Sequence, residues 1–302
     1  MMNNIIETHD LCCQFNRIKS VDKINIQIPE GAIYGFLGPN GAGKTTTLKM
    51  LLGLLNPSSG SIKIFGEKMP TNRISILREI GSLIESPSFY GHLSGYKNLK
   101  IFASIYGLPN SAIEDVLNIV ELTPHANRPV KHYSFGMKQR LGIAIALIHK
   151  PKLLILDEPT NGLDPAGIQQ IRDLIKRLPT LYNTTVLISS HLLSEVEQIA
   201  THVGIIHGGK MLFQDAFDVL RKQQTSYLII DLEDPSKAYQ SMQKTGWDIT
   251  VNHTAISIRL DTPGQKTKIF ECLKNFNIIN VKEKHRSLED IFLDWTGVKK
   301  EV

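Results

Sequence analysis

The stretch GPNGAGKTT, residues 38–46, decides the fold of this chain. It fits the pattern G-x-x-x-x-G-K-[ST] and lies between AIYGFL (32–37), an apolar run typical of a buried strand, and a predicted helix over 45–55. The glycines allow a loop whose N–H groups surround phosphate oxygens, while Lys44 reaches the β- and γ-phosphates and the Thr45 hydroxyl ligates Mg²⁺. The sequence therefore predicts a nucleotide site made of Gly38, Pro39, Asn40, Gly41, Ala42, Gly43, Lys44, Thr45 and Thr46.

A second predicted strand ends in two acids, in LLILDEP at residues 153–159. Asp157 lies at the carboxyl end of that strand, where it is placed to hold Mg²⁺ directly or through water. Glu158 follows it and is placed to polarise a water for attack on the γ-phosphate. Taken alone, an acidic pair after a strand is more often a capped loop. The phosphate loop upstream favours the catalytic interpretation.

Two further motifs point toward phosphate. In YSFGMKQRLGIA (133–144), a hydroxyl and a glycine, Ser134 and Gly136, open a predicted helix, and free N–H groups at a helix start bind anions. In SSH (189–191), His191 follows the predicted strand TTVLIS (184–189), at the sheet edge where open α/β sheets bind ligands. A lone histidine is more often a structural residue, but this position predicts that it faces the same nucleotide.

Composition narrows the class of protein. The chain has 302 residues, of which 42% are apolar and 21% charged, which is ordinary globular composition. The net charge of +5 comes from scattered Lys and Arg residues, so no nucleic-acid partner is predicted, and a solvated surface is favoured over a basic membrane-facing one.

Three cysteines have no metal-ligand spacing and indicate reduced thiols. The first residues lack a signal-peptide pattern, and the longest apolar run, Leu141 to Ile148, is far shorter than the ~18 residues of a membrane span. A soluble, cytoplasmic chain is expected.

The predicted elements divide the chain into two domains. Strands alternating with helices indicate a mostly parallel sheet, interrupted by a helical insert over about residues 87–150. The polar stretch RKQQTS (221–226) is a plausible boundary, so we expect a first domain over 4–224 and a small accessory α/β domain over 225–302.

The motifs GPNGAGKTT, YSFGMKQR, LILDEPTNGLD and SSH, in this order and spacing, resemble those of the ATP-binding cassette ATPases over roughly residues 4–224. The resemblance implies an α/β P-loop cassette with a mixed sheet core, a helical insert and an antiparallel β part. It also implies ATP and Mg²⁺ as cofactors, with Glu158 and His191 catalytic. In that family two cassettes dimerise head to tail, so the signature residues Ser134, Phe135, Gly136 and Met137 would face the partner's ATP. Asp164 resembles the acid at the dimer interface, and Phe15 resembles the aromatic that stacks on adenine, with a core phenylalanine as the alternative.

Two positions depart from the family pattern. The signature reads Tyr-Ser-Phe-Gly-Met where most relatives have Leu-Ser-Gly-Gly-Gln, so Phe135 replaces a glycine. At the entry to the insert, where the family has a glutamine that touches Mg²⁺, the chain has Glu85. The resemblance therefore implies a Mg²⁺ ligand set of Thr45, Glu85 and Asp157, although Glu85 is alternatively an ordinary loop residue.

The glutamate variant, the YSFGMKQR signature and the SLEDIFL of the tail resemble the ATPases of bacitracin exporters and lantibiotic self-immunity transporters. The expected function is ATP hydrolysis that drives export of an antimicrobial peptide or drug through a separate membrane permease, with a second ATPase subunit and a peripheral position at the cytoplasmic face of the membrane. A docking surface near Ser88, Phe89, Tyr90 and Leu93 is the corresponding hypothesis, with insert core as the alternative for Phe89 and Tyr90. The other functions considered are an ATPase acting on ribosomes or DNA and a slow ATP-binding regulatory module.

Overall fold

The computed structural model describes residues 3–85, 87–260, 262 and 264–297. The chain forms two compact units, Met1–Phe217 and Asp218–Val302, each described by itself below. The division falls a few residues before the stretch 221–226 that the sequence suggested as a boundary.

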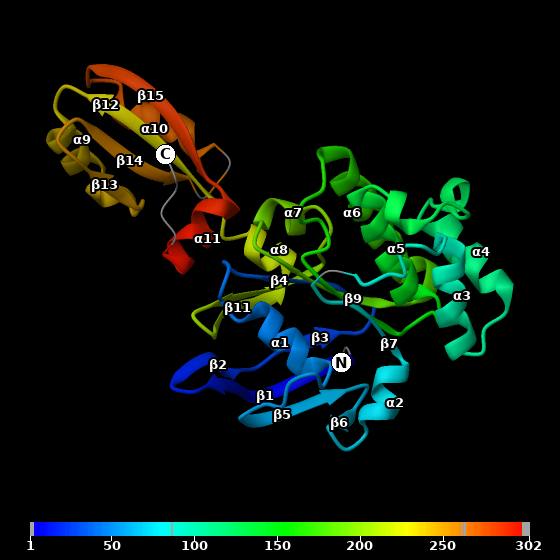
Figure 1. The fold of residues 1–302 in the computed structure, drawn as a ribbon. Helices are drawn as coiled ribbons and strands as arrows, with labels where there is room; N and C mark the ends of the chain where they lie inside the picture. The colour runs from blue at the N-terminus through cyan, green and yellow to red at the C-terminus, as the bar shows by residue number, and fades with distance from the viewer. Residues whose placement is uncertain (1–2, 86, 261, 263, 298–302) are drawn as a thin grey trace. The chain divides into compact units, whose positions relative to one another are not determined.

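The centre of the first unit is a six-stranded sheet, visible in Figure 1. Its neighbouring strands are parallel except for the pair β11 and β10. Every residue of β4, β8 and β9 is buried, as expected for parallel strands covered on both faces. The strand order is β11 (Lys210–Ala216), β10 (His202–His207), β4 (Ile33–Leu37), β9 (Thr185–Ser190), β8 (Leu153–Asp157), β7 (Ile80–Leu83).

A second, antiparallel sheet packs against this one. Its order is β2 (Ile18–Ile24), β1 (Asn4–Phe15), β5 (Ser59–Ile64), β6 (Glu67–Met69), with β3 (Gln27–Pro29) also paired to β1. One core cluster includes Ile6 of β1, Phe36 of β4 and Leu48 of the helix α1 (Lys44–Leu51), so this helix is held between the two sheets. The mixed sheet with an added antiparallel β part confirms the expected cassette architecture.

Three helices of the insert group beside β7 in Figure 1: α3 (Gly95–Ile105), α4 (Asn110–Ile119) and α5 (Phe135–Leu147). A Cβ atom placed on Gly81 of β7 would lie 2.0 Å from the carbonyl oxygen of Ala146, so strand and helix backbone touch there. Gly142, one turn earlier in α5, faces the side chains of Leu83 and Pro87. The remaining helical elements of the unit are α2 (Arg73–Arg78), η1 (Thr123–His125), η2 (Val130–His132), α6 (Pro165–Tyr182), α7 (Leu193–Glu197) and the start of α8 (Phe217–Arg221).

The second unit is a four-stranded antiparallel sheet with helices on one face. The strand order is β13 (Ile249–Val251), β14 (Ala255–Leu260), β12 (Thr225–Leu232), β15 (Ile278–Arg286). The residues Ile230, Ile256 and Ile269 belong to a core that joins this sheet to α9 (Pro235–Met242) and α10 (Gln265–Leu273). The unit also contains η3 (Gln243–Thr245) and α11 (Leu288–Thr296), which Ser287 begins with a capping box.

Two predicted elements differ from those observed. The helix predicted over 45–55 ends at Leu51, because Gly53 adopts the left-handed conformation (φ 61°) that stops helices. The run INIQI (24–28), whose alternation of apolar and polar residues predicts one strand, is broken, since β2 ends at Ile24 and β3 begins at Gln27. The side chain of Thr8 causes the break, because its hydroxyl accepts from the N–H of Ile26 and donates to the carbonyl of Ile24. Within the described residues no helix is long and apolar enough to cross a membrane.

Candidate nucleotide-binding and hydrolysis site

The loop between β4 and α1 needs its glycines for space as well as for conformation. A Cβ atom on Gly38 would lie 2.4 Å from the carbonyl oxygen of Ile206, and one on Gly43 would lie 2.5 Å from that of Ser20. Gly41 and Gly43 also have φ angles of 80° and 108°, which side chains disfavour. The loop therefore turns tightly into the N-terminus of α1, the geometry that presents backbone N–H groups to a phosphate.

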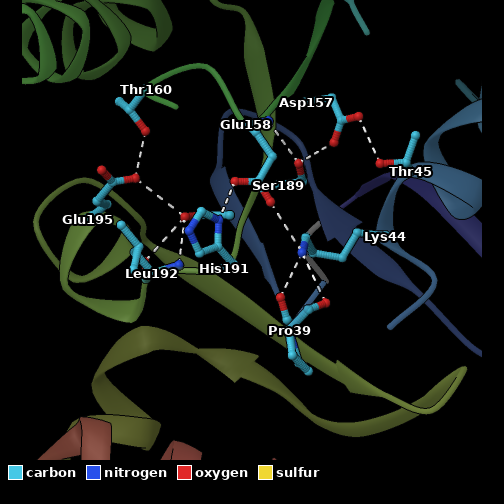
Figure 2. A network of polar contacts seen from close by, with 12 residues as sticks. Pro39, Lys44, Thr45, Asp157, Glu158, Thr160, Ser189, His191, Leu192 and Glu195 are labelled. Carbon is cyan, nitrogen blue, oxygen red and sulfur yellow. Dashed lines mark hydrogen bonds and ion pairs between the residues drawn. The ribbon is translucent and has the colours of Figure 1, made fainter. Parts of the chain in front are cut away.

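Lys44 lies in the centre of this loop. Its side chain is only 5% exposed, and its Nζ donates to the carbonyl oxygens of Gly38 at 2.6 Å and Pro39 at 3.3 Å. It also forms an ion pair with Glu158 Oε1 at 3.2 Å (Figure 2). The loop thus holds one buried cation beside the positive end of a helix, where an anionic ligand is stabilised.

Thr45 and Asp157 bring two oxygen ligands together. The Thr45 hydroxyl donates to Asp157 Oδ2 at 2.9 Å, and Ser189 Oγ donates to Asp157 Oδ1 at 2.5 Å. Hydroxyl and carboxylate oxygens suit Mg²⁺, which proteins often bind with one carboxylate and substrate phosphates. In the described part of the chain, no group of three or more His, Cys, Asp or Glu side chains forms a metal site of its own. The donor set fits a Mg²⁺ ion that arrives with a nucleotide.

Glu158 connects the lysine to the histidine. Its backbone has a φ of 48°, and its N–H donates to Ser189 Oγ at 2.9 Å. Its carboxylate lies between Lys44 and His191, with Oε2 at 2.6 Å from His191 Nδ1 (Figure 2). The structure therefore brings together Lys44, Glu158 and His191, three predicted residues from separate segments, in one continuous polar network.

The signature residues 134–137 lie at the start of α5. Ser134 caps that helix, because its hydroxyl accepts from the N–H of Met137 at 3.2 Å, and the Met137 side chain is buried. The ring of Phe135 is 55% exposed and lies against Gly162: a Cβ atom placed there would be 3.2 Å from Phe135 Cε1. One position further, Gly136 faces Leu163. The signature turn thus rests on the loop that leads to Asp164.

Comparison with known proteins places this arrangement in a family. A family model described as ABC transporter matches residues 21–161. The bacitracin transport ATP-binding protein BcrA of Bacillus licheniformis is 47% identical over 98% of both chains, and that of Enterococcus faecalis is 40% identical over 98% of both. The chain belongs to the ABC transporter ATP-binding proteins.

Other similar proteins are also described as transport ATP-binding proteins or as parts of ABC transporters. The lantibiotic transport ATP-binding protein SrtF of Streptococcus pyogenes is 45% identical over 71% of this chain and 92% of its own. Among solved structures, cbiO1 of Clostridium perfringens, part of the ABC transporter complex cbiONQ, has a TM-score of 0.66 and 27% identity over 73% of this chain and 94% of that one. As a member of this family of ATPases, the chain binds and hydrolyses ATP.

The remaining predicted ABC site residues take no part in the hydrogen bonds of this network that are described above. Phe15, at the end of β1, is 50% exposed, so the alternative of a core phenylalanine is wrong. Asp164 caps α6, accepting from the N–H of Gly167 at 3.1 Å. Tyr90 is 56% exposed, which excludes it from the core of the insert, whereas Phe89 lines a cavity of 460 Å³ beside Asp157.

Glu85 lies outside the central network. Its side chain is 64% exposed and forms an ion pair with Lys49 Nζ at 2.7 Å. It nevertheless lines the same 460 Å³ cavity as Asp157 and Glu158. A role as a Mg²⁺ ligand therefore competes with the ion pair of Glu85 and Lys49 for the same carboxylate.

Sequence reasoning missed several residues that hold the network. Ser189 bonds both to Asp157 and to the N–H of Glu158, and its place at the end of a strand in the SSH motif was the signal available. Glu195 and Thr160, which bond to each other at 2.6 Å, gave no signal, because a single acid and a single hydroxyl form no recognisable spacing.

Proposed function

We propose that this chain is the ATP-hydrolysing subunit of an exporter that moves an antimicrobial peptide of the bacitracin or lantibiotic type. The bacitracin transport relative, 47% identical over 98% of both chains, carries this proposal, because the similarity extends through both units. The proposed partners are a separate membrane permease and a second ATPase subunit, with the chain bound at the cytoplasmic face of the membrane. No nucleic acid takes part.

ATP binds with its β- and γ-phosphates against the loop 38–46, where Lys44 and the N–H groups at the start of α1 neutralise their charge. Thr45 and Asp157 hold the Mg²⁺ that accompanies the nucleotide, and that ion offsets charge on the phosphates. Glu85 joins this set when it leaves Lys49.

Hydrolysis then depends on Glu158. Its carboxylate accepts a proton from the water whose oxygen bonds to the γ-phosphorus, while the bond from that phosphorus to the β–γ bridging oxygen breaks and ADP leaves. His191 holds the carboxylate in place through Nδ1, and Lys44 stabilises the negative charge on the phosphates. Ser134, Phe135, Gly136 and Met137 complete the site of the partner subunit, Asp164 contacts that subunit, and Phe15 stacks on adenine.

The test uses Glu158→Gln, which removes the proton acceptor but preserves the shape of the side chain. The chain and its permease are expressed in a peptide-sensitive bacterium, and we measure ATPase rate, ATP affinity and the inhibitory concentrations of bacitracin and a lantibiotic. The variant is expected to hydrolyse ATP at least about 100-fold more slowly, with ATP affinity retained and resistance lost. Glu114→Gln, an exposed residue of α4, is the matched control and keeps both activities.

Each result has a distinct meaning. If resistance persists without ATP hydrolysis, the export proposal is wrong, and if Glu158→Gln hydrolyses ATP normally, the proton-accepting role is wrong. Wild-type chain that hydrolyses ATP but protects against neither peptide would also overturn the proposed substrate class.

A further inference from the structure

Glu195 is a buried carboxylate beside the hydrolysis site with no role in the chemistry described above. It lies on α7, and its side chain is 9% exposed. Its Oε2 accepts a hydrogen bond from Thr160 Oγ1 at 2.6 Å and lies 3.4 Å from Ser190 Oγ, whose hydroxyl donates either to this oxygen or to the carbonyl of Leu192 at 3.3 Å. Figure 2 shows the carboxylate of Glu195 pointing toward Thr160. Hydrogen bonds from hydroxyls to an ionised carboxylate are roughly twice as strong as neutral ones.

The two hydroxyls belong to different loops. Thr160 follows Glu158 by two positions and begins the segment 160–164, on which the signature turn rests through Gly162 and Leu163. Ser190 is the last residue of β9 and directly precedes His191, and its Oγ also accepts from the N–H of Leu192 at 3.0 Å. One oxygen of Glu195 therefore connects the loop after β8 with the loop after β9.

The space between these loops lies next to the proposed proton acceptor. A cavity of 200 Å³ is lined by Glu158, His191 and Glu195 together with Gly162 and Leu163. The 2.6 Å contact between Glu158 and His191 depends on where the loop after β9 lies relative to the loop after β8. A carboxylate that bonds to both loops fixes that relative position.

We propose that Glu195 is a positioning residue for ATP hydrolysis, acting through Thr160 and Ser190 to hold His191 against Glu158 and to hold the segment 160–164 beside them. The inference rests on the proposed roles of Glu158 and His191. It predicts that loss of the Thr160–Glu195 bond slows the hydrolysis step without weakening ATP binding, because Lys44 and the phosphate loop are untouched.

The principal variant is Thr160→Val, which keeps the shape of the side chain and removes the hydroxyl. Its matched control is Thr184→Val: Thr184 is also fully buried and donates to the carbonyl of Pro151 at 2.7 Å, at the opposite end of β9. We expect Thr160→Val to lower kcat about tenfold or more with unchanged ATP affinity, Thr160→Ser to restore kcat, and Thr184→Val to lower the melting temperature while keeping kcat.

Glu195→Gln gives a second measurement, because its amide carbonyl still accepts a hydrogen bond but carries no charge. We expect an intermediate kcat, and we expect the double variant Thr160→Val/Glu195→Gln to be no slower than Thr160→Val alone. Two outcomes would overturn the inference. One is a double variant whose loss of kcat equals the sum of the two single losses. The other is that Thr160→Val and Glu195→Gln both keep the kcat of the folded control. If Thr160→Val does not fold, the kcat of Glu195→Gln decides whether the inference holds. A wild-type chain without ATP hydrolysis would instead contradict the proposed function.

Discussion

Glu158 has a backbone conformation that few residues of its size adopt. Its φ of 48° lies in the left-handed region, which costs about 1–3 kcal/mol for a residue other than glycine. The N–H bond to Ser189, at 2.9 Å, and the contacts of the carboxylate with Lys44 and His191 offset this cost. This backbone conformation places the carboxylate of Glu158 at the carboxyl edge of the sheet, where the proposed proton transfer takes place.

His149 is a second residue whose surroundings alter its chemistry. It follows α5, and its ring stacks on that of Tyr106 with centroids 4.4 Å apart and planes 6° apart. Burial lowers the pKa of His149 below its ordinary value of 6.5, outweighing the opposite effects of the Ile80 backbone and the Glu79 carboxylate. The folded chain therefore favours the neutral ring.

This pKa shift predicts a loss of stability in acid. As pH falls below about 6.5, the unfolded chain binds a proton that the folded chain does not bind until a lower pH, so the free energy of unfolding decreases over that interval. His149→Phe keeps the stacking and removes the titration. Urea unfolding at pH 7.5 and 5.5 is expected to show a smaller difference for this variant than for the wild type. The same change at the exposed His253 is the control, and an equal pH dependence in wild type and His149→Phe would contradict the prediction.

The elements predicted best are those with a strong local pattern. The apolar runs of β4, β8 and β9 were evident, because these strands are buried along their length, and the start of α5 was evident from Ser134 and Gly136. The strand β7, with the sequence IGSL, was missed because it is short and contains glycine, and β15 was missed because it contains the charged residues Lys282, Glu283, Lys284 and Arg286. Charged residues on an edge strand discourage pairing with other chains. They also interrupt the apolar pattern by which a strand is predicted from sequence.

The candidate site also contains residues that the sequence predicted and residues that it did not. Lys44, Thr45, Asp157, Glu158 and His191 were predicted, because each belongs to a motif of fixed spacing. That Lys44, Glu158 and His191 meet depends on β4, β9 and β8 being neighbours in the sheet, and the sequence does not give that order. The supporting residues Thr160 and Glu195 are recognised only in the structure, where their loops lie side by side.

Contact between β7 and α5 predicts the effect of one substitution. Gly81→Ala would place a methyl group 2.0 Å from the carbonyl oxygen of Ala146, so the strand and helix backbones must separate. We expect the free energy of unfolding to decrease by about 1–3 kcal/mol, the usual cost of overpacking. Gly91→Ala is the control, because its nearest neighbour would be 3.6 Å away, in ordinary contact. Equal melting temperatures for Gly81→Ala and Gly91→Ala would show that the contact between β7 and α5 tolerates the added methyl group.

At the scale of the whole molecule, the chain has a separate core in each unit. Ile64 belongs to the core of the first unit and Ile256 to that of the second, and both side chains are fully buried. The phosphate loop and the residues that contact it all lie in the first unit. Compact units with their own cores generally fold as units.

This organisation predicts that the two cores respond independently. Ile256→Ala is expected to reduce the stability of the second unit by about 2–5 kcal/mol and to lower one transition in scanning calorimetry, while the ATPase rate at a low temperature persists. Ile64→Ala, an equal truncation in the first unit, is expected to lower the other transition. A single transition that moves equally in both variants would argue against independent unfolding.

The close contact of Gly81 with α5 makes that helix a lever. The contact lies at Ala146, near the carboxyl end of a helix of 13 residues, while Ser134 and Phe135 lie at the other end. At 1.5 Å per residue the helix is about 20 Å long, so a tilt of about 5° around the contact displaces the signature turn by about 1.5 Å. Because Pro87, after β7, lies against Gly142 close to this contact, a small displacement there would be larger at Ser134, at the far end of the helix.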